Sequence, residues 1–262
     1  MERLLEFSQT ELLRYLLIVC RVSPLMIIGP FWGSSLVPGQ VRVYLALMVS
    51  ALLLPVVRAP ISPDAASSMV ALVFSVASEL LLGFVFAYMA VLLFAAVQMA
   101  GQLVDIQVGF GIANVFDPLS GSQVTLIGQV LYMAAIFVFI LLDGHHLMLK
   151  GLAESFSVAP PGHPFSGMAP IQLIVERGGS LLFILAAQVA APAMTALFLV
   201  NLAMGLVSRV LPQINIFLVG LPLNVGIGLL VLAASMGIFP SVMRYAINGL
   251  AGQMAALTLA IR

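Results

Sequence analysis

The chain has 262 residues, of which 62% are hydrophobic and only 8% are charged, and its mean hydropathy is +1.18. Soluble domains carry roughly 25% charged residues, so this chain cannot cover itself with a polar surface, and we expect an all-α polytopic membrane protein. The formal net charge is zero and the sequence has no basic block, which argues against a nucleic-acid partner.

Six apolar segments of helical length follow one another along the chain. They cover residues 12–28, 43–57, 69–100, 126–142, 181–207 and 214–239. The second is short, Pro192 interrupts the fifth, and Pro222 lies among several glycines in the sixth. We therefore expect about six long, partly kinked helices. If the six alternate across a bilayer, the distribution of Lys and Arg places both termini on the cytoplasmic side.

The third segment is longer than a bilayer requires. From Met69 to Ala100 it would extend about 48 Å at ~1.5 Å per residue, against ~30 Å for a hydrocarbon core. We expect this helix to tilt, to kink near Gly83, or to extend beyond the bilayer. Ser75, Glu79 and Gly83 recur every four residues and form a narrow stripe that should face protein.

Five polar residues at apparent membrane depth are candidate functional contacts. Arg14 and Arg21 lie seven residues apart, on one face of the first segment, and Asn201 is in register with Arg209 in the fifth. Glu79 is a proton-relay candidate, because carboxylates inside membranes are often functional. The alternative, which the absence of a second nearby acid favours, is an inter-helix or inter-subunit contact with Arg14 or Arg21.

A glycine-rich stretch, residues 101–118, separates the third and fourth segments. Its middle, residues 108–116, has no charge and contains two phenylalanines. Gly109 and Gly111 permit backbone angles that other residues resist, so the segment can fold back tightly. This pattern predicts a re-entrant or plug-like loop, and a hydrophobic surface turn is an equally compatible interpretation.

No pattern predicts a catalytic, metal or cofactor site. Asp143, His145 and His146 contain ligand atoms, but adjacent histidines at a helix end are expected to point in different directions, so a helix cap is favoured. Ser155 has no hydrolase motif around it, and residues 109–114 fail the dinucleotide-binding fingerprint. We therefore expect no metal and no cofactor, and we do not expect an enzyme.

A series of short motifs extends through nearly the whole chain in a recognisable order. They are Gly101-Gln-x-x-Asp-x-Gln107, Gly109-Phe-Gly-Ile-Ala-Asn114, Asp117-Pro118, Asp143-Gly-His145, Ser155-Phe156, Asn201-Leu-Ala-Met-Gly205, Arg209-Val-Leu-Pro-Gln-Ile-Asn215 and Val219-Gly-Leu-Pro222. As a set, they resemble the FliR/SctT family of type III export-gate membrane proteins. Asp143-Gly-His-His146 and the Arg209 motif favour its flagellar FliR branch over the SctT proteins of injectisomes.

The resemblance implies a structural role in protein export. Members form a helical hetero-oligomer with FliP-like and FliQ-like subunits, work with an FlhB-like export protein, and pass unfolded flagellar proteins out of the cytoplasm. It also implies a FliP-like part, residues 1–180, followed by a FliQ-like helical hairpin, residues 181–262. The expected location is the bacterial inner membrane, in contact with lipid within the flagellar basal body, with part of the core on the periplasmic side.

The resemblance also implies a function for the glycine-rich stretch. The family's corresponding loop closes the export channel, which makes residues 106–118 a plug loop. Ile112, Val115 and Phe116 are the expected sealing side chains. The full set of plug residues is Gly109, Phe110, Gly111, Ile112, Ala113, Asn114, Val115 and Phe116.

Two alternatives remain from the sequence. One is a subunit of an injectisome export gate of the SctT type. The other is an ion-coupled secondary transporter, with Glu79 and the interrupted fifth and sixth segments forming a site at the bilayer midplane. Such transporters often have inverted repeats, and the two halves of this chain differ in segment length and polarity.

Overall fold

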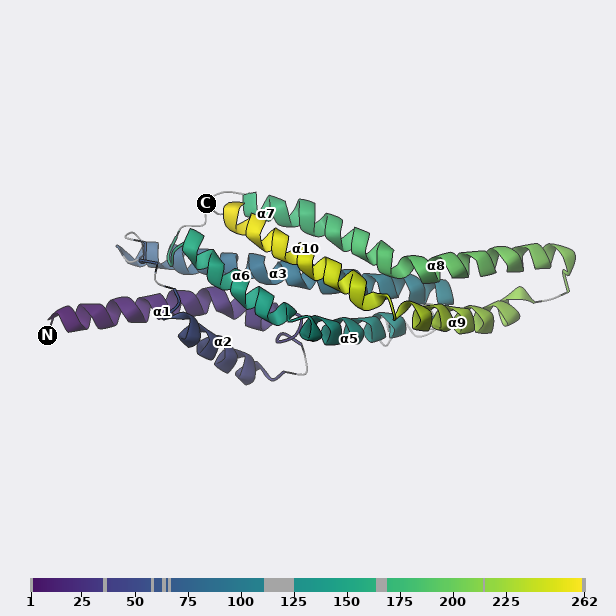
Figure 1. Ribbon diagram of the computed structural model, residues 1–262, viewed down its shortest axis with the longest axis horizontal. Helices are drawn as coiled ribbons and strands as arrows, with labels where there is room; N and C mark the ends of the chain where they lie inside the picture. Colours follow the sequence, from purple (N-terminus) through teal and green to yellow (C-terminus); the bar gives the residue numbers. More distant parts are fainter. Residues whose placement is uncertain are drawn as a thin grey trace. The chain divides into compact units, whose positions relative to one another are not determined.

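The computed structural model describes residues 2–34, 37–57, 59–62, 65, 67–110, 125–163, 169–213 and 215–260. Within these ranges the chain is helical and has no strand, which confirms the all-α prediction (Figure 1). The elements in chain order are α1 (Glu2–Ile28), α2 (Gly39–Leu53), α3 (Met69–Val108), α5 (Leu126–Leu141), α6 (Gly144–Val158), α7 (Ala169–Leu173), the π-helix η3 (Ile174–Gly178), α8 (Gly179–Val210), α9 (Ile216–Ser235) and α10 (Phe239–Ala260).

The helices form two compact units. Unit 1 comprises residues 1–92, 143–179 and 247–262, and unit 2 comprises residues 93–142 and 180–246. Helices α3 and α10 contribute one part to each unit, because the divisions fall after Leu92 and Ala246. These units are discontinuous in sequence, and the proposed boundary near residue 180 stays a prediction.

Unit 1 is built around the first part of α3. Gly83 of α3 lies directly against the backbone of α1, since a Cβ added there would be 2.1 Å from the carbonyl oxygen of Arg21. Helix α6 contacts the last part of α10 at Gly151, where an added Cβ would be 3.1 Å from the sulfur of Met254. Helix α2 is joined to α1 by a hydrogen bond from the Tyr15 hydroxyl to the Leu47 carbonyl.

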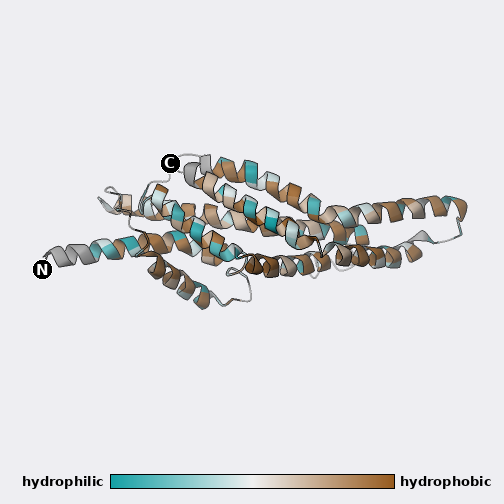
Figure 2. Ribbon diagram, in the orientation of Figure 1, coloured by the Kyte–Doolittle hydropathy of each residue, from teal (hydrophilic) through white to brown (hydrophobic). Residues whose placement is uncertain are grey.

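Two helices, α6 and α10, lie outside the six predicted apolar segments because they are amphipathic. The buried residues of α6 recur at helical spacing and are Gly144, Met148, Gly151, Leu152, Ser155 and Phe156. Those of α10 follow the same period and are Phe239, Met243, Ala246, Ile247, Leu250, Met254 and Leu257. Figure 2 shows hydrophilic residues interrupting α6 and α10, whereas α5 and α9 are hydrophobic almost throughout. A search for uninterrupted apolar runs therefore finds α5 and α9 but not α6 and α10.

Unit 2 packs the last part of α3 against α5 and the hairpin of α8 and α9. Phe94 of α3 makes edge-to-face contacts with Tyr132 and Phe139 of α5. Helices α8 and α9 lie side by side (Figure 1), and the Asn224 amide of α9 donates a hydrogen bond to the Asn201 side chain of α8. Helix α8 continues through Pro192, so the fifth segment forms part of one helix with a proline inside it.

Three helical stretches among the described residues are long and apolar enough to cross a membrane. They are Met69–Val108, Ile171–Val210 and Leu218–Ser235, and a fourth is added if α5 and α6 are counted together. The first predicted segment, within α1, does not qualify, and α2 is too short to qualify alone. The described residues thus contain three or four candidate crossings by length and composition, fewer than the six assumed, and the side on which each terminus lies stays a prediction.

Candidate functional site: the base of the glycine-rich loop and a buried ion pair

The glycine-rich loop begins later than the sequence predicted. Helix α3 continues to Val108, so residues 101–108 are helical, including the first three of the predicted 106–118 loop. Gly109 then has φ of 103°, a left-handed conformation that favours glycine and ends the helix. Phe110 follows in the turn, and the predicted plug residues Gly111, Ile112, Ala113, Asn114, Val115 and Phe116 lie outside the described residues.

Asp105 lies at the base of this loop and joins its two ends. The Asp105 side chain, 3% exposed, accepts hydrogen bonds from the backbone N–H groups of Ile127 (3.1 Å) and Gly128 (3.3 Å) at the start of α5. The backbone carbonyl of Asp105 accepts the N–H groups of Gly109 (3.1 Å) and Phe110 (3.0 Å). One residue thus contacts the chain where it leaves α3 and where it enters α5.

Two glycines bring α3 and α5 into backbone contact beside Asp105. A Cβ added at Gly101 would lie 2.2 Å from the Cα of Gly128. A Cβ added at Gly128 would lie 3.0 Å from the Thr125 hydroxyl and 3.3 Å from the carbonyl oxygen of Gln98. A side chain at Gly101 would force the two helices apart, whereas one at Gly128 would require its neighbours to shift by only a few tenths of an ångström.

An apolar groove lies beside the same crossing. Its volume is about 400 Å³. It is lined by Phe110, Leu126, Ile127, Val130, Leu131, Leu229, Leu232, Ala233 and Met236. Phe110, the second predicted plug residue, is therefore part of the groove wall.

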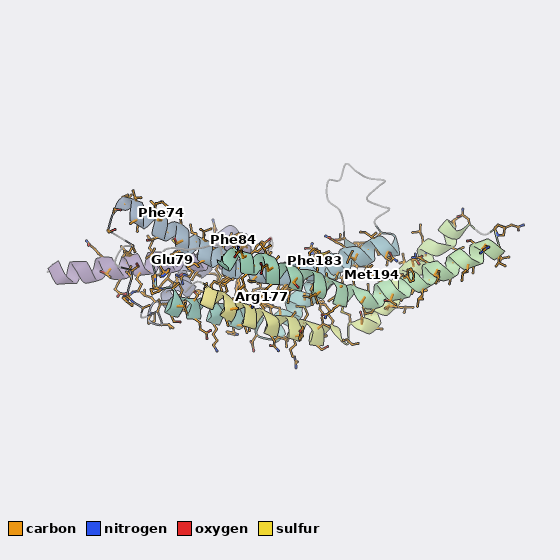
Figure 3. All side chains as sticks on the ribbon, turned by 90° about the horizontal axis from the view of Figure 1, so that it is seen from above. Phe74, Glu79, Phe84, Arg177, Phe183 and Met194 are labelled. Carbon is orange, nitrogen blue, oxygen red and sulfur yellow. The ribbon has the colours of Figure 1, made fainter. Side chains whose placement is uncertain are left out.

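The buried ion pair joins α1 to α3 in unit 1. Arg21 donates from Nε to Glu79 Oε2 (2.5 Å) and from Nη2 to Glu79 Oε1 (2.9 Å), and both residues are fully buried. In Figure 3, Glu79 points into the packed interior, whereas Phe74 and Phe84 lie along the outer face of the same helix, 68% and 45% exposed. Of the two candidate partners for Glu79, the structure selects Arg21.

Three further groups complete the polar environment of this pair. Arg21 Nη1 donates to the Ser155 hydroxyl of α6 (3.1 Å), and the guanidinium carbon lies 4.0 Å from the centre of the Phe156 ring. The Gly162 N–H donates to Glu79 Oε1 (2.8 Å). Gly162 has φ of 81°, so a glycine is favoured where the turn after α6 presents this N–H. A bidentate, fully hydrogen-bonded pair is the arrangement in which buried charges are tolerated.

Ser155, Phe156 and Gly162 were not assigned to this site from the sequence. Ser155 and Phe156 formed one of the motifs, but no pattern connected them with Arg21. The arrangement around Glu79 fits an inter-helix contact, because each of its carboxylate oxygens accepts a hydrogen bond from a specific donor.

The other predicted polar contacts lie elsewhere. Arg14 pairs with Glu11 on its own helix at 2.8 Å. Asn201 pairs with Asn224, and Arg209 is exposed in the last turn of α8. The five predicted polar residues are therefore distributed over separate places in the fold.

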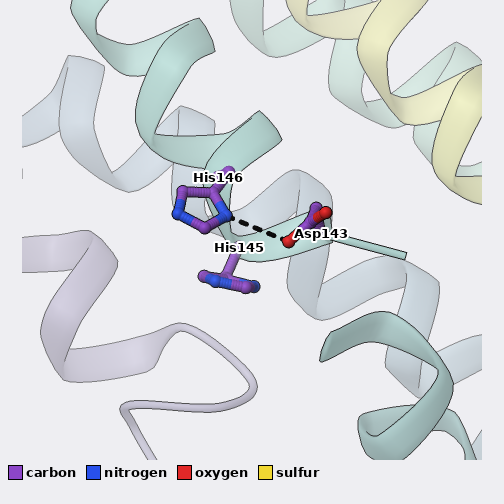
Figure 4. Close-up of side chains that lie close together, drawn as sticks. All are labelled: Asp143, His145 and His146. Carbon is purple, nitrogen blue, oxygen red and sulfur yellow. Dashed lines mark hydrogen bonds and ion pairs between the residues drawn. The ribbon is translucent and has the colours of Figure 1, made fainter. Parts of the chain in front are cut away.

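Asp143, His145 and His146 lie together at the start of α6 (Figure 4). The two imidazole rings are 4.1 Å apart, so the expectation that they point in different directions is wrong. Asp143 Oδ1 contacts His146 Nδ1 at 3.2 Å, and one ligand atom from each of the three residues lies within 4.8 Å of the others. Asp143 occupies the N-cap position of α6 in a left-handed conformation and makes no side-chain cap bond. Asp143 and His146 are exposed to solvent.

The helices, their exposed apolar faces and the buried polar contacts define an all-α membrane protein. The family described as "Bacterial export proteins, family 1" matches residues 12–250. The chain belongs to this family of bacterial export proteins, which confirms the FliR resemblance drawn from the motifs.

Proteins named flagellar biosynthetic protein FliR are similar to the chain over most of their length. The Bacillus subtilis (strain 168) protein is 34% identical over 232 residues, 88% of each chain. The Aquifex aeolicus (strain VF5) protein is 32% identical over 235 residues, 88% of this chain and 86% of its own. The Escherichia coli (strain K12) protein is 31% identical over 217 residues, 82% of this chain and 81% of its own.

Proposed function

We propose that the chain is a subunit of the flagellar protein export apparatus in the bacterial inner membrane. It helps to form the channel through which unfolded flagellar proteins leave the cytoplasm, and it has a structural role, not a catalytic one. The family match over residues 12–250 carries this proposal, because it includes the glycine-rich loop, α5, α6 and the α8–α9 hairpin. The similar proteins named above are flagellar, which favours the flagellar over the injectisome apparatus.

The proposed partners are FliP-like, FliQ-like and FlhB-like proteins. Residues 1–180 form the FliP-like part in this proposal, and residues 181–262 form the FliQ-like hairpin. Large apolar side chains are exposed along α8 and α9, such as Phe198 (59%), Leu206 (61%) and Leu230 (71%). Such surfaces require lipid or protein neighbours, as a subunit of a membrane assembly would have.

The ion-coupled transporter receives less support. Its proposed midplane carboxylate, Glu79, is fully buried in a bidentate pair with Arg21. An ion or proton entering this site would have to separate the pair and leave Arg21 without a counter-ion.

Co-purification tests the export-gate proposal. The chain, tagged at its C-terminus and extracted in mild detergent, should co-purify with FliP-like and FliQ-like membrane proteins in one large particle, identified by mass spectrometry. Recovery of a single monodisperse chain without partners, under conditions that preserve another membrane complex, would contradict the proposal.

The plug proposal predicts a leak. Changing Ile112, Val115 and Phe116 together to serine should increase ion permeability severalfold in cells that contain the assembled gate, because small polar side chains cannot exclude water from a constriction. The measurement is ion flux across the membrane, normalised to the amount of assembled particle. Leu211→Ser is a matched control, since Leu211 is a 52% exposed apolar residue in another connection. Unchanged flux in the triple variant would show that these residues do not seal the channel.

A further inference from the structure

We infer that Asp143, His145 and His146 form a binding site for a divalent transition-metal ion at the start of α6. The proposed export role uses none of these side chains, although Asp143-Gly-His145 is one of the motifs that carry the family resemblance. The inference is independent of that role. It replaces the interpretation of Asp143 as a helix cap, because the Asp143 side chain makes no cap hydrogen bond with α6.

The three side chains supply the donor atoms that Zn²⁺, Ni²⁺ and Cu²⁺ prefer. Imidazole nitrogens suit these ions, and a carboxylate accompanies two imidazoles in several zinc sites with three protein ligands. One ligand atom from each of the three residues lies within 4.8 Å of the others. Ca²⁺ and Mg²⁺ fit less well, because they bind oxygen ligands and two of the three donors here are nitrogens.

The spacing between Asp143 and His146 already matches that of two ligands on one ion. Asp143 Oδ1 lies 3.2 Å from His146 Nδ1. Two ligand atoms bound to one tetrahedral zinc ion, each at about 2.1 Å from it, are separated by about 3.4 Å. The His145 ring lies against the His146 ring (Figure 4), with 4.1 Å between their centres. Rotation of the His145 side chain can therefore bring its ligand atom to the same ion.

His145 carries the observation that a hydrogen bond between Asp143 and His146 does not explain. That bond would account for the 3.2 Å contact without an ion. His145 Nδ1, however, is buried from solvent and has no hydrogen-bond partner among the described residues. A buried polar atom without a partner is unfavourable, and each such atom in a folded protein requires an explanation. An ion held beside it by Asp143 and His146 would give the His145 ring a partner.

Charge and exposure favour the same assignment. The first turn of α6 carries a partial positive charge, which opposes the binding of a cation unless an acid lies beside it. Asp143 supplies this acid. The Asp143 and His146 side chains are 76% and 71% exposed, so an ion can reach them from solution in the isolated chain. Lys150, one turn after His146, lies 3.9 Å from Glu154 and thus has its own counter-ion.

Equilibrium dialysis of the purified full-length chain against Zn²⁺ tests the site. The chain has only three histidines and one cysteine, so the background is low if the affinity tag contains no histidine. We expect one zinc ion per chain. His146→Ala and Asp143→Asn should each weaken binding at least about tenfold, since removing even a supporting residue of a metal site costs that much. The matched control is His163→Ala, which changes the remaining histidine and should bind zinc like the unchanged protein.

Cu²⁺ identifies the ligands by electron paramagnetic resonance. The spectrum should show two coordinated nitrogens in the unchanged chain, and one nitrogen after His145→Ala or His146→Ala. Zn²⁺ should also slow amide hydrogen exchange at the start of α6, because the ion would join the N-cap residue to the first turn.

Three results would overturn the inference. Equal zinc binding by the unchanged chain and His146→Ala would indicate an adventitious ion only. A copper spectrum without two nitrogen ligands would exclude the paired histidines. If His163→Ala weakens zinc binding as much as His146→Ala does, the ion is bound elsewhere.

Discussion

Changing Glu79 to leucine should destabilise unit 1 by about 3–5 kcal/mol, the usual cost of leaving a buried charge without its partner. Arg21 is fully buried, and its guanidinium donates to the two Glu79 oxygens and to the Ser155 hydroxyl. Ser155 alone cannot neutralise the guanidinium, so Arg21 must recruit water or move out of the core. The Gly162 N–H also loses its acceptor.

The measurement is denaturant unfolding of the purified chain in detergent, compared with Glu11→Leu as a matched control. Glu11 also pairs with an arginine, Arg14, but its side chain is 31% exposed, so its loss should cost less than about 1 kcal/mol. If Glu79→Leu is no more destabilising than Glu11→Leu, the buried pair does not stabilise the fold.

A double variant tests whether the loss of stability comes from a buried charge left without its partner. Arg21→Met with Glu79→Leu replaces both ions by apolar side chains, so no charge remains unpaired in the core. We expect this double variant to be more stable than either single variant, because replacement of a whole buried pair is often close to neutral. A double variant as unstable as the sum of the two single variants would mean that the two residues stabilise the fold independently.

The sequence indicated that Glu79 faces protein, but not which arginine it meets. Arg14 and Arg21 lie seven residues apart on one face of α1, so helical periodicity alone does not distinguish between them. The choice depends on how far α1 is displaced along α3, which is a tertiary property. The backbone contact between Gly83 and Arg21 determines that displacement, and no local pattern in either helix reveals it.

The start of the glycine-rich loop was misplaced for a related reason. The sequence pattern predicts a loop that begins at Gly101, since glycine often interrupts helices. In the structure it lies inside α3 and allows close contact with Gly128 of α5, a packing role that the same residue type also fills. Asp105 belonged to a recognised motif, but its role depends on the N–H groups of α5, more than 20 residues later in the chain.

Gly83→Ala should destabilise unit 1 by about 1–3 kcal/mol, and Gly83→Val by more, because the added carbon collides with backbone. An added Cβ would lie 2.1 Å from the carbonyl oxygen and 2.9 Å from the carbonyl carbon of Arg21, so α1 and α3 must separate. The control is Gly252→Ala in α10, where nothing lies within 4 Å of an added Cβ. That change should stabilise the helix by about 0.5–1 kcal/mol, because alanine is the better helix former. Equal stability of Gly83→Ala and the unchanged protein would mean that the two backbones are not in contact.

The effect of Gly83→Ala should also depend on the ion pair. Gly83 lies one helical turn after Glu79 and touches the backbone of Arg21, so separating the helices there also lengthens the Arg21–Glu79 hydrogen bonds. In the Arg21→Met, Glu79→Leu background there are no such bonds to lengthen, and only the steric part of the cost remains. We therefore expect Gly83→Ala to be less destabilising in that background, with a coupling of about 0.5–3 kcal/mol measured by the same unfolding experiment. If the cost is identical in both backgrounds, the glycine permits close packing without positioning the ion pair.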